Sequence, residues 1–187
     1  MDAPTDLPPR GLPSRAPDVP ILRTARLTLR GHRLDDFADC VRLWSDPGVT
    51  RYIAARPFTQ EEIWTRLLRY AGHWAMMGFG YWMVRETATD RLVGEVGLAE
   101  HRRDLTPSVA GVPEIGWVLT PSAHGQGFAT EAVRAAVEWG DAHFDRKRTV
   151  CLIHPDNAPS LRVAEKTGYR EYVRTTYKDA PTILLER

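Results

Sequence analysis

SAHGQGFATEA, at residues 122–132, lies between a predicted strand at 114–119 and a predicted helix at about 128–143. Gly125 and Gly127 carry no side chains, so the backbone can curl there and bring successive N–H groups toward one point. The helix that begins next adds its unpaired N–H groups and the positive end of its dipole. This stretch therefore predicts that main-chain N–H groups bind a pyrophosphate without help from a lysine.

Two other phosphate-binding motifs are similar to this stretch but fit it poorly. A P-loop requires Gly-x-x-x-x-Gly-Lys-Ser/Thr, and the lysine is absent. The dinucleotide-binding fingerprint requires a third glycine where Thr130 stands, and it usually occupies the first β-α turn of its domain. Here about two-thirds of the chain precedes the stretch. A helix start with incidental glycines is the structural alternative.

Hydrophobic periodicity predicts one α/β domain over residues 23–187, with a mixed, mostly antiparallel sheet and flanking helices. Residues 1–22 hold six prolines and are predicted to be a flexible arm outside it. Strand 114–119, the glycine-rich helix and strand 149–153 form a β-α-β unit, whose strands should be parallel. The other strands are expected at 26–30, 79–85, 92–98, 169–177 and 182–185, the other helices at 34–44, 60–77 and 157–167, and a turn at 46–48.

Composition excludes several classes of protein. The 187 residues are 43% hydrophobic and 26% charged, as in a globular domain, and the formal net charge is +1. A nucleic-acid clamp needs a marked basic excess, and a membrane span needs about 20 consecutive apolar residues. Cys40 and Cys151 are far apart, which predicts free thiols in a reducing cytoplasm. The histidines lack metal-type spacing, so no metal site is expected.

The sequence resembles the GNAT superfamily of acetyl-CoA-dependent N-acetyltransferases, in particular its Rim-type branch of ribosomal-protein N-terminal acetyltransferases. The family motif is Gln/Arg-x-x-Gly-x-Gly/Ala, which in this branch continues Tyr/Phe-Ala-Thr-Glu-Ala. Residues 125–132 match it, whereas Ser122 departs from it at the leading position. Three further stretches match in the family's order, and the resemblance spans about 23–187. They are the opening strand at 24–30, Pro-Glu-Ile-Gly-Trp at 113–117 and the block at 157–169.

The resemblance implies that an acetyl group passes from acetyl-CoA to a primary amine, either a protein N-terminus or a small molecule. In this fold the strands on either side of the glycine-rich helix separate, and the pantetheine arm of acetyl-CoA lies between them. The N–H of Val118 is the implied oxyanion donor. The implied cofactor-binding residues are Trp117, Val118, Leu119, Gly125, Gln126, Gly127, Phe128, Ala129, Thr130 and Asn157.

The catalytic residues are less firmly indicated. Many relatives carry a tyrosine acid at the position that Ala164 occupies here. The Rim-type branch instead implies a serine, and Ser160 matches it, although a helix-capping role is equally compatible. Glu114, at the start of its strand, His154, at the end of another, and Glu95 are the candidate bases. The sequence does not require a dedicated base, because a thioester is already activated.

The acceptor is predicted to bind where helices 34–44 and 60–77 meet the sheet. No acidic cluster indicates a polycationic aminoglycoside, and the amine and the oligomeric state, monomer or homodimer, stay open. Aromatic residues are frequent in this region, but aromatic side chains at such spacing usually belong to a core. They are Trp64, Tyr70, Trp74, Tyr81 and Trp82. Two rival functions are a non-catalytic acyl-CoA-binding module and an NAD(P)H-dependent oxidoreductase.

Overall fold

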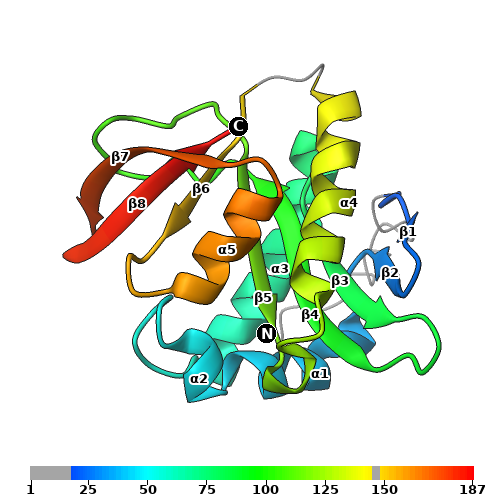
Figure 1. Ribbon diagram of the computed structural model, residues 1–187. Helices are drawn as coiled ribbons and strands as arrows, with labels where there is room; N and C mark the ends of the chain where they lie inside the picture. The colour runs from blue at the N-terminus through cyan, green and yellow to red at the C-terminus, as the bar shows by residue number, and fades with distance from the viewer. Residues whose placement is uncertain (1–17, 145–147) are drawn as a thin grey trace, which may run out of the picture.

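A computed structural model describes residues 18–144 and 148–187 and shows a single eight-stranded sheet with helices on both faces (Figure 1). The strands are β1 Leu22–Arg23, β2 Leu27–Arg30, β3 Tyr81–Glu86, β4 Leu92–Ala99, β5 Glu114–Leu119, β6 Val150–Ile153, β7 Arg170–Tyr177 and β8 Ala180–Glu186. The helices are η1 Leu34–Asp36, α1 Phe37–Trp44, α2 Pro47–Thr50, α3 Gln60–Met77, η2 Pro121–Ala123, α4 Phe128–His143 and α5 Ala158–Lys166. The predicted mixed sheet is confirmed.

The strand order is β1-β2-β3-β4-β5-β6-β8-β7, and β5 and β6 form the one parallel pair among the described residues. This confirms the parallel β-α-β unit built from β5, α4 and β6. The last two strands are exchanged relative to sequence order, so β8 pairs with β6 and β7 forms the edge.

Two apolar clusters hold the layers together, one on each face of the sheet. Ala132, Val133 and Ala136 follow helical spacing on α4 and pack with Val96 and Ile115 of the sheet. On the other face, α1 and α3 pack on Met83 and Val118. Successive side chains of a strand point to opposite faces, which is why β4 and β5 supply both clusters. The site described below lies at the ends of these two well-packed strands.

The chain enters the sheet earlier than the sequence predicted. Leu22 pairs with Leu29, and the indole of Trp82 donates a hydrogen bond to the Pro20 carbonyl at 2.8 Å. Residues 18–22, predicted as part of the arm, therefore belong to the folded domain. Proline blocks regular ladders but leaves a carbonyl that can accept, and the prediction neglected that capacity. The rest of the arm, residues 1–17, lies outside the described residues.

The predicted turn at 46–48 is the start of the short helix α2. The carboxylate of Asp46 accepts hydrogen bonds from the N–H groups of Gly48 and Val49, and Pro47 occupies the first turn. An Asp-Pro pair fits a helix start as well as a turn. This short helix places the connection to α3 beside the separated ends of β5 and β6.

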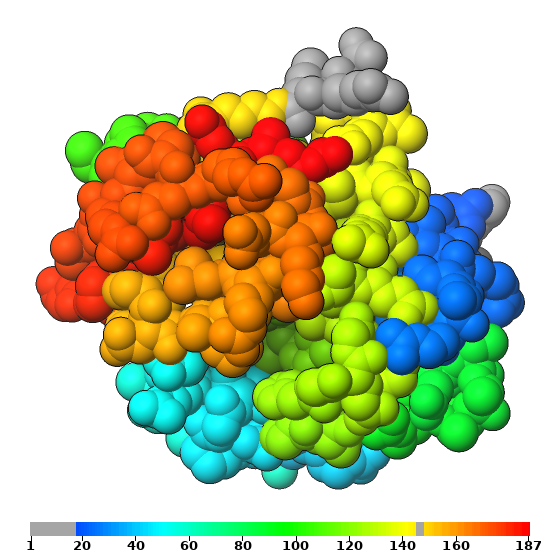
Figure 2. Space-filling view, in the orientation of Figure 1, coloured from blue at the N-terminus to red at the C-terminus, as the bar shows by residue number. Residues whose placement is uncertain are grey.

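Separation of β5 from β6 opens the sheet at its centre. Glu114 and Val150 are their one paired position, after which β6 continues alongside β8. Figure 2 shows a recess there, floored by green atoms of the β5 region and bordered by α5 in orange, the start of α4 in yellow-green and the α2–α3 connection in cyan. Ligands of sheets with parallel strands commonly bind beyond the carboxyl ends of those strands.

Candidate active site

The loop before α4 presents a row of free main-chain donors. Gly125 and Gly127 have φ values of 74° and 78°, a left-handed conformation that favours glycine. None of the N–H groups of residues 125–130 has a hydrogen-bond acceptor within the described residues, whereas the next, from Glu131, bonds to the Gly127 carbonyl. Six consecutive donors at the positive end of a 16-residue helix are suited to binding an anion. We call residues 125–130 the phosphate loop.

The edge of β5 that faces the recess carries unpaired backbone groups beyond Glu114. The N–H of Thr120 donates to the Val93 carbonyl of β4 at 2.9 Å, in register with the pairing of Val118 and Glu95. Because backbone groups alternate along a strand, the N–H of Val118 also points toward β4. The same alternation directs the backbone groups of Trp117 and Leu119 into the recess. The N–H of Val118, the oxyanion donor that the resemblance implies, is thus directed toward β4 and away from the recess.

Two of the predicted residues stand at the start of α5, on the opposite wall. The side chain of Asn157 caps this helix by accepting a hydrogen bond from the Ser160 N–H at 3.3 Å. The Ser160 hydroxyl is half-buried and makes no hydrogen bond to any residue in the described part of the chain. Asn157 thus has a structural task, while the Ser160 hydroxyl is available to a ligand.

Glu114 is buried and ion-paired instead of lying on the surface. Both of its carboxylate oxygens accept hydrogen bonds from Arg103, at 2.6 and 2.7 Å, and 8% of its side chain is exposed. The neighbouring His101 is half-buried, and its partial burial together with the charge of Arg103 lowers its pKa to about 3. Arg103 comes from residues 100–113, whose polar sequence is typical of a solvated loop. This segment has no apolar periodicity, so its sequence gives no indication that Arg103 pairs with Glu114.

His154 follows β6 and reaches across the recess. Its ring lies 5.3 Å from the ring of Tyr52, which belongs to the connection between α2 and α3. Its Nδ1 faces the N–H of Asp156 at 3.1 Å and accepts that hydrogen bond. The hydrogen of the neutral ring is therefore on Nε2, which can donate a hydrogen bond but cannot act as a base. Sequence reasoning missed Tyr52, whose partner is about a hundred residues away.

Glu95 is fully buried in β4 on the α1–α3 side. Its carboxylate accepts hydrogen bonds from Trp44 Nε1 and the Tyr70 hydroxyl, both at 3.1 Å. His32 Nε2 lies 3.3 Å away, although its angle is too poor for a hydrogen bond. Burial alone would raise the pKa of Glu95, but the neighbouring His32 and Arg66 hold it below the usual value. These contacts indicate a structural anion and leave no route to a substrate.

The aromatic residues of this region divide into core and surface. Tyr70, Trp74 and Trp82 are buried, as expected for core residues. Tyr81 is half-buried and stacks on Tyr70, and a side chain on Gly116 would overlap its hydroxyl. The requirement for glycine at this position places the Tyr81 hydroxyl against the middle of β5. The side chain of Trp64 belongs to neither group, because it is 40% exposed on α3.

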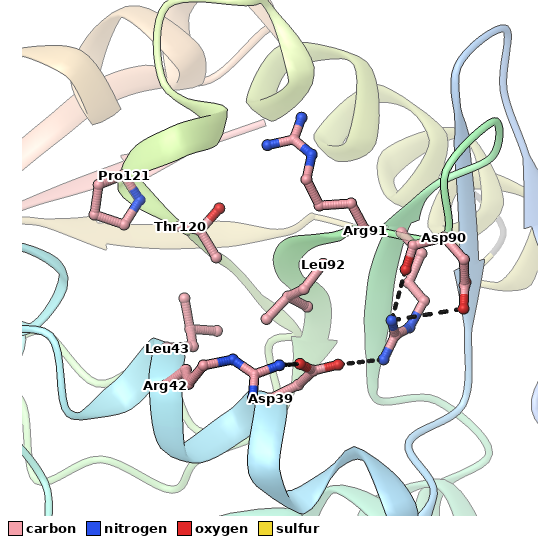
Figure 3. Close-up of a pocket in the computed structure, with 9 residues that line it drawn as sticks. Asp39, Arg42, Leu43, Asp90, Arg91, Leu92, Thr120 and Pro121 are labelled. Carbon is pink, nitrogen blue, oxygen red and sulfur yellow. Dashed lines mark hydrogen bonds and ion pairs between the residues drawn. The ribbon is translucent and has the colours of Figure 1, made fainter.

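A separate cavity of about 500 Å³ lies between α1 and the β3–β4 hairpin (Figure 3). Its charged groups are largely satisfied by one another, since Asp39 pairs with Arg42 and with Arg85. At one end it reaches Thr120 and Pro121, just before the phosphate loop. The cavity lies outside the recess, and its paired charges give no indication of a ligand.

The described residues contain neither a candidate metal cluster nor a candidate membrane-spanning helix. Residues 18–144 and 148–187 contain no group of three or more His, Cys, Asp or Glu side chains placed to hold a metal ion. Over the same ranges, no helix has the length and apolar character that crossing a membrane requires.

Known proteins share both the sequence and the fold. The family model described as "Acetyltransferase (GNAT) domain" matches residues 26–170. The N-acetyltransferase p20 of Bacillus licheniformis, itself uncharacterised, is 28% identical over 151 residues, which cover 80% of this chain and 82% of p20. A solved GnaT-family acetyltransferase of Bordetella pertussis has a TM-score of 0.79 at 30% identity, over 90% of this chain and 99% of that one.

A more distant structure shares the fold. RimL, a ribosomal L7/L12 alpha-N-protein acetyltransferase in complex with coenzyme A, has a TM-score of 0.73 at 15% identity, over 90% of this chain and 97% of RimL. The family match covers most of the described residues and includes the phosphate loop, β5 and α5. The chain therefore belongs to the GNAT family of acetyl-CoA-dependent N-acetyltransferases.

Proposed function

We propose that the chain is a catalytically active enzyme that transfers the acetyl group of acetyl-CoA to a primary amine in the recess between β5 and β6. The observation that carries this proposal is the row of six free N–H groups in residues 125–130, next to the point where the two strands separate. The loop suits the pyrophosphate of acetyl-CoA, and the unpaired edge of β5 suits its amide-bearing arm, which can bind as an added strand does.

Acetyl-CoA supplies an activated thioester, and the residues around the recess bind it and manage charge. The amine attacks the thioester carbon, the C–S bond breaks, and the departing sulfur takes up a proton. We assign oxyanion stabilisation to the N–H of Trp117, because the alternation along β5 directs it into the recess. The Ser160 hydroxyl passes a proton to sulfur and regains one from water; its lack of a hydrogen-bond partner among the described residues and the motif it matches support this role.

The base candidates do not support a side chain dedicated to deprotonating the amine. Glu114 is held at both oxygens by Arg103, and the accepting nitrogen of His154 is occupied. Glu95 is fully buried among its own donors. In this proposal the amine gives its proton to water, and only the neutral fraction of the amine reacts. Glu114, paired with Arg103, then has a structural role at the start of β5.

The acceptor that fits best is the α-amine of a peptide, as in the Rim-type branch. Support comes from the matching motifs at 24–30, 125–132 and 157–169 and from the shared fold of RimL. The wall of the recess also carries Tyr52 and His154, which offer stacking and hydrogen bonding to a peptide. A small amine bound by the same residues is the second candidate.

The test follows release of the CoA thiol from acetyl-CoA with a panel of acceptors. The panel contains peptides that differ in their first residue, free amino acids and small amines, and calorimetry measures acetyl-CoA binding separately. We expect tight binding of acetyl-CoA and amine-dependent thiol release, fastest with a subset of the peptides. Tight binding without release for any amine would favour the acyl-CoA-binding module, and competition by NAD(P)H would favour the oxidoreductase.

A further inference from the structure

Arg26, just before β2, is joined to the phosphate loop and to α4 by hydrogen bonds, an ion pair and a contact with an aromatic ring. The guanidinium of Arg26 donates from Nη1 to the Gln126 carbonyl at 3.0 Å and from Nε to Glu131 at 2.8 Å. It also covers the ring of Phe128, 4.4 Å from the ring centroid. One arginine, about a hundred residues away in sequence, thus contacts the loop and the first turn of α4.

Glu131 completes this arrangement from the helix side. One of its oxygens accepts hydrogen bonds from the Thr24 hydroxyl at 2.6 Å and from the Arg26 N–H at 3.0 Å. The other lies 2.6 Å from Arg26 Nη2. Although partial burial alone would raise the pKa of Glu131, these donors lower it, so the carboxylate is charged at neutral pH. Thr24, Arg26 and Glu131 together are named the latch below.

The bond to the Gln126 carbonyl fixes the direction of a donor. In a trans peptide the C=O of one residue and the N–H of the next point in opposite directions. Holding the Gln126 carbonyl toward Arg26 therefore turns the N–H of Gly127 away from Arg26, onto the outer side of the loop. Glycine at 127 has a low barrier to other conformations, so this peptide would otherwise rotate easily. A rotated peptide would present a carbonyl oxygen to the anion in place of a donor.

The latch also offsets a negative charge close to the proposed pyrophosphate site. Glu131 lies in the first turn of α4, where its carboxylate would repel a bound pyrophosphate. The guanidinium of Arg26 faces that carboxylate directly and offsets its charge. Thr87 donates to the Arg26 carbonyl at 2.8 Å and fixes the backbone from which the guanidinium extends.

We propose that Arg26 is a positioning residue that sets the orientation of the 126–127 peptide and neutralises Glu131, and thereby determines the affinity for the diphosphate of acetyl-CoA. This inference rests on the proposed function of the phosphate loop. In this proposal Arg26 acts through its contacts with the loop and does not contact the reacting atoms. Its loss should therefore change the dissociation constant of CoA and the KM for acetyl-CoA, and leave kcat at saturating acetyl-CoA nearly unchanged.

The experiment compares two arginines that lie close together on neighbouring strands. Arg26→Met removes the latch cation, whereas Arg23→Met removes the same charge from β1, where Arg23 contacts Thr28 and not the loop. We expect Arg26→Met to weaken CoA binding about tenfold, the effect of losing one hydrogen bond to a charged group, and Arg23→Met to change it less than twofold. Arg26→Lys should recover part of the loss, because one ammonium can replace one of the contacts.

The Gly127 amide gives a readout that a purely structural role would not move. Addition of CoA should shift its NMR resonance in the wild type and in Arg23→Met, and much less in Arg26→Met. Glu131→Gln keeps the bond from Arg26 to the loop and should alter affinity less than threefold. Equal affinity of Arg26→Met and Arg23→Met, or a loss in Glu131→Gln as large as in Arg26→Met, would overturn the proposal.

Two controls separate the possible failures. Failure of the wild type to bind acetyl-CoA would refute the proposed function itself, whereas binding that is indifferent to Arg26 would refute the latch alone. Should Arg26→Met fail to fold, Arg26→Lys decides. A lysine variant that binds CoA as tightly as the wild type although its Gly127 response is lost would then contradict the peptide-orienting role.

Discussion

Gly127→Asp tests whether the phosphate loop binds an anion, and Gly127→Asn is its matched control. Both side chains tolerate the left-handed conformation at φ 78° at a cost of roughly 1 kcal/mol. A new Cβ would meet Arg26 Nη2 at 3.5 Å, an ordinary contact, so neither variant should clash. We expect both to fold, with Tm lowered by about 2–4 °C as that strain predicts.

The two variants have nearly the same shape and differ in the negative charge of Asp, part of which the neighbouring Arg26 would offset. A carboxylate about 4 Å from one phosphate charge costs roughly 1 kcal/mol at the dielectric constant of water and roughly 4 kcal/mol at an effective value of 20. Gly127→Asp should therefore bind acetyl-CoA between about fivefold and 1,000-fold more weakly than Gly127→Asn. Calorimetric titration at two salt concentrations measures this, and the difference should shrink at high salt. Affinities within twofold of each other would refute the anion site.

Three further predictions concern catalysis and stability. Ser160→Ala should lower kcat by about 10²-fold in the thiol-release assay with little change in acetyl-CoA affinity; a wild-type rate would return Ser160 to helix packing. Glu95→Gln should lower the free energy of unfolding in urea by about 3 kcal/mol, because Arg66 and the buried donors of Trp44 and Tyr70 lose their anion; a loss below about 1 kcal/mol would contradict this role. Burial alone would raise the pKa of Asp36, but Arg30 and other donors lower it to about 2. Its folded value lies below the unfolded one, so a stabilisation of about 2 kcal/mol should be present above pH 4 and disappear as the pH falls toward 2. Urea unfolding at stepped pH should show this loss in the wild type and not in Asp36→Asn.

Local patterns predicted much of the fold. Thr59 and Glu62 form a capping box at the start of α3, a pattern visible in the sequence, and Gly78 ends that helix in the left-handed conformation. The pair of glycines at 125 and 127 located the phosphate loop, because their positive φ values are a property of these residues themselves. Features encoded within a few residues were readable from the sequence.

Contacts between residues far apart in the chain could not be predicted from the sequence in the same way. The contact of Arg103 with Glu114 and that of Tyr52 with His154 join segments whose own patterns give no indication of a partner. The direction of the Val118 N–H depends on the register between β4 and β5, which a single strand does not encode. The sequence therefore predicted which segments surround the recess, whereas the contacts between their side chains depend on the three-dimensional pairing.

The location of the free hydrogen-bond donors around the recess bears on how the proposed acetyl transfer would be accelerated. Around the recess the ionisable side chains are engaged: Glu114 with Arg103, and His154 with the Asp156 N–H. The free donors belong to the backbone of the phosphate loop and, by the alternation of its pairing, to the edge of β5. A positioned base contributes about 10²–10⁴-fold to a rate, which corresponds to roughly 3–5 kcal/mol. Correct orientation of two reactants lowers the barrier by about 7–11 kcal/mol. A thioester needs little activation. Binding it through the free main-chain donors, as in the proposed function, would therefore use orientation, which is the larger of the two effects.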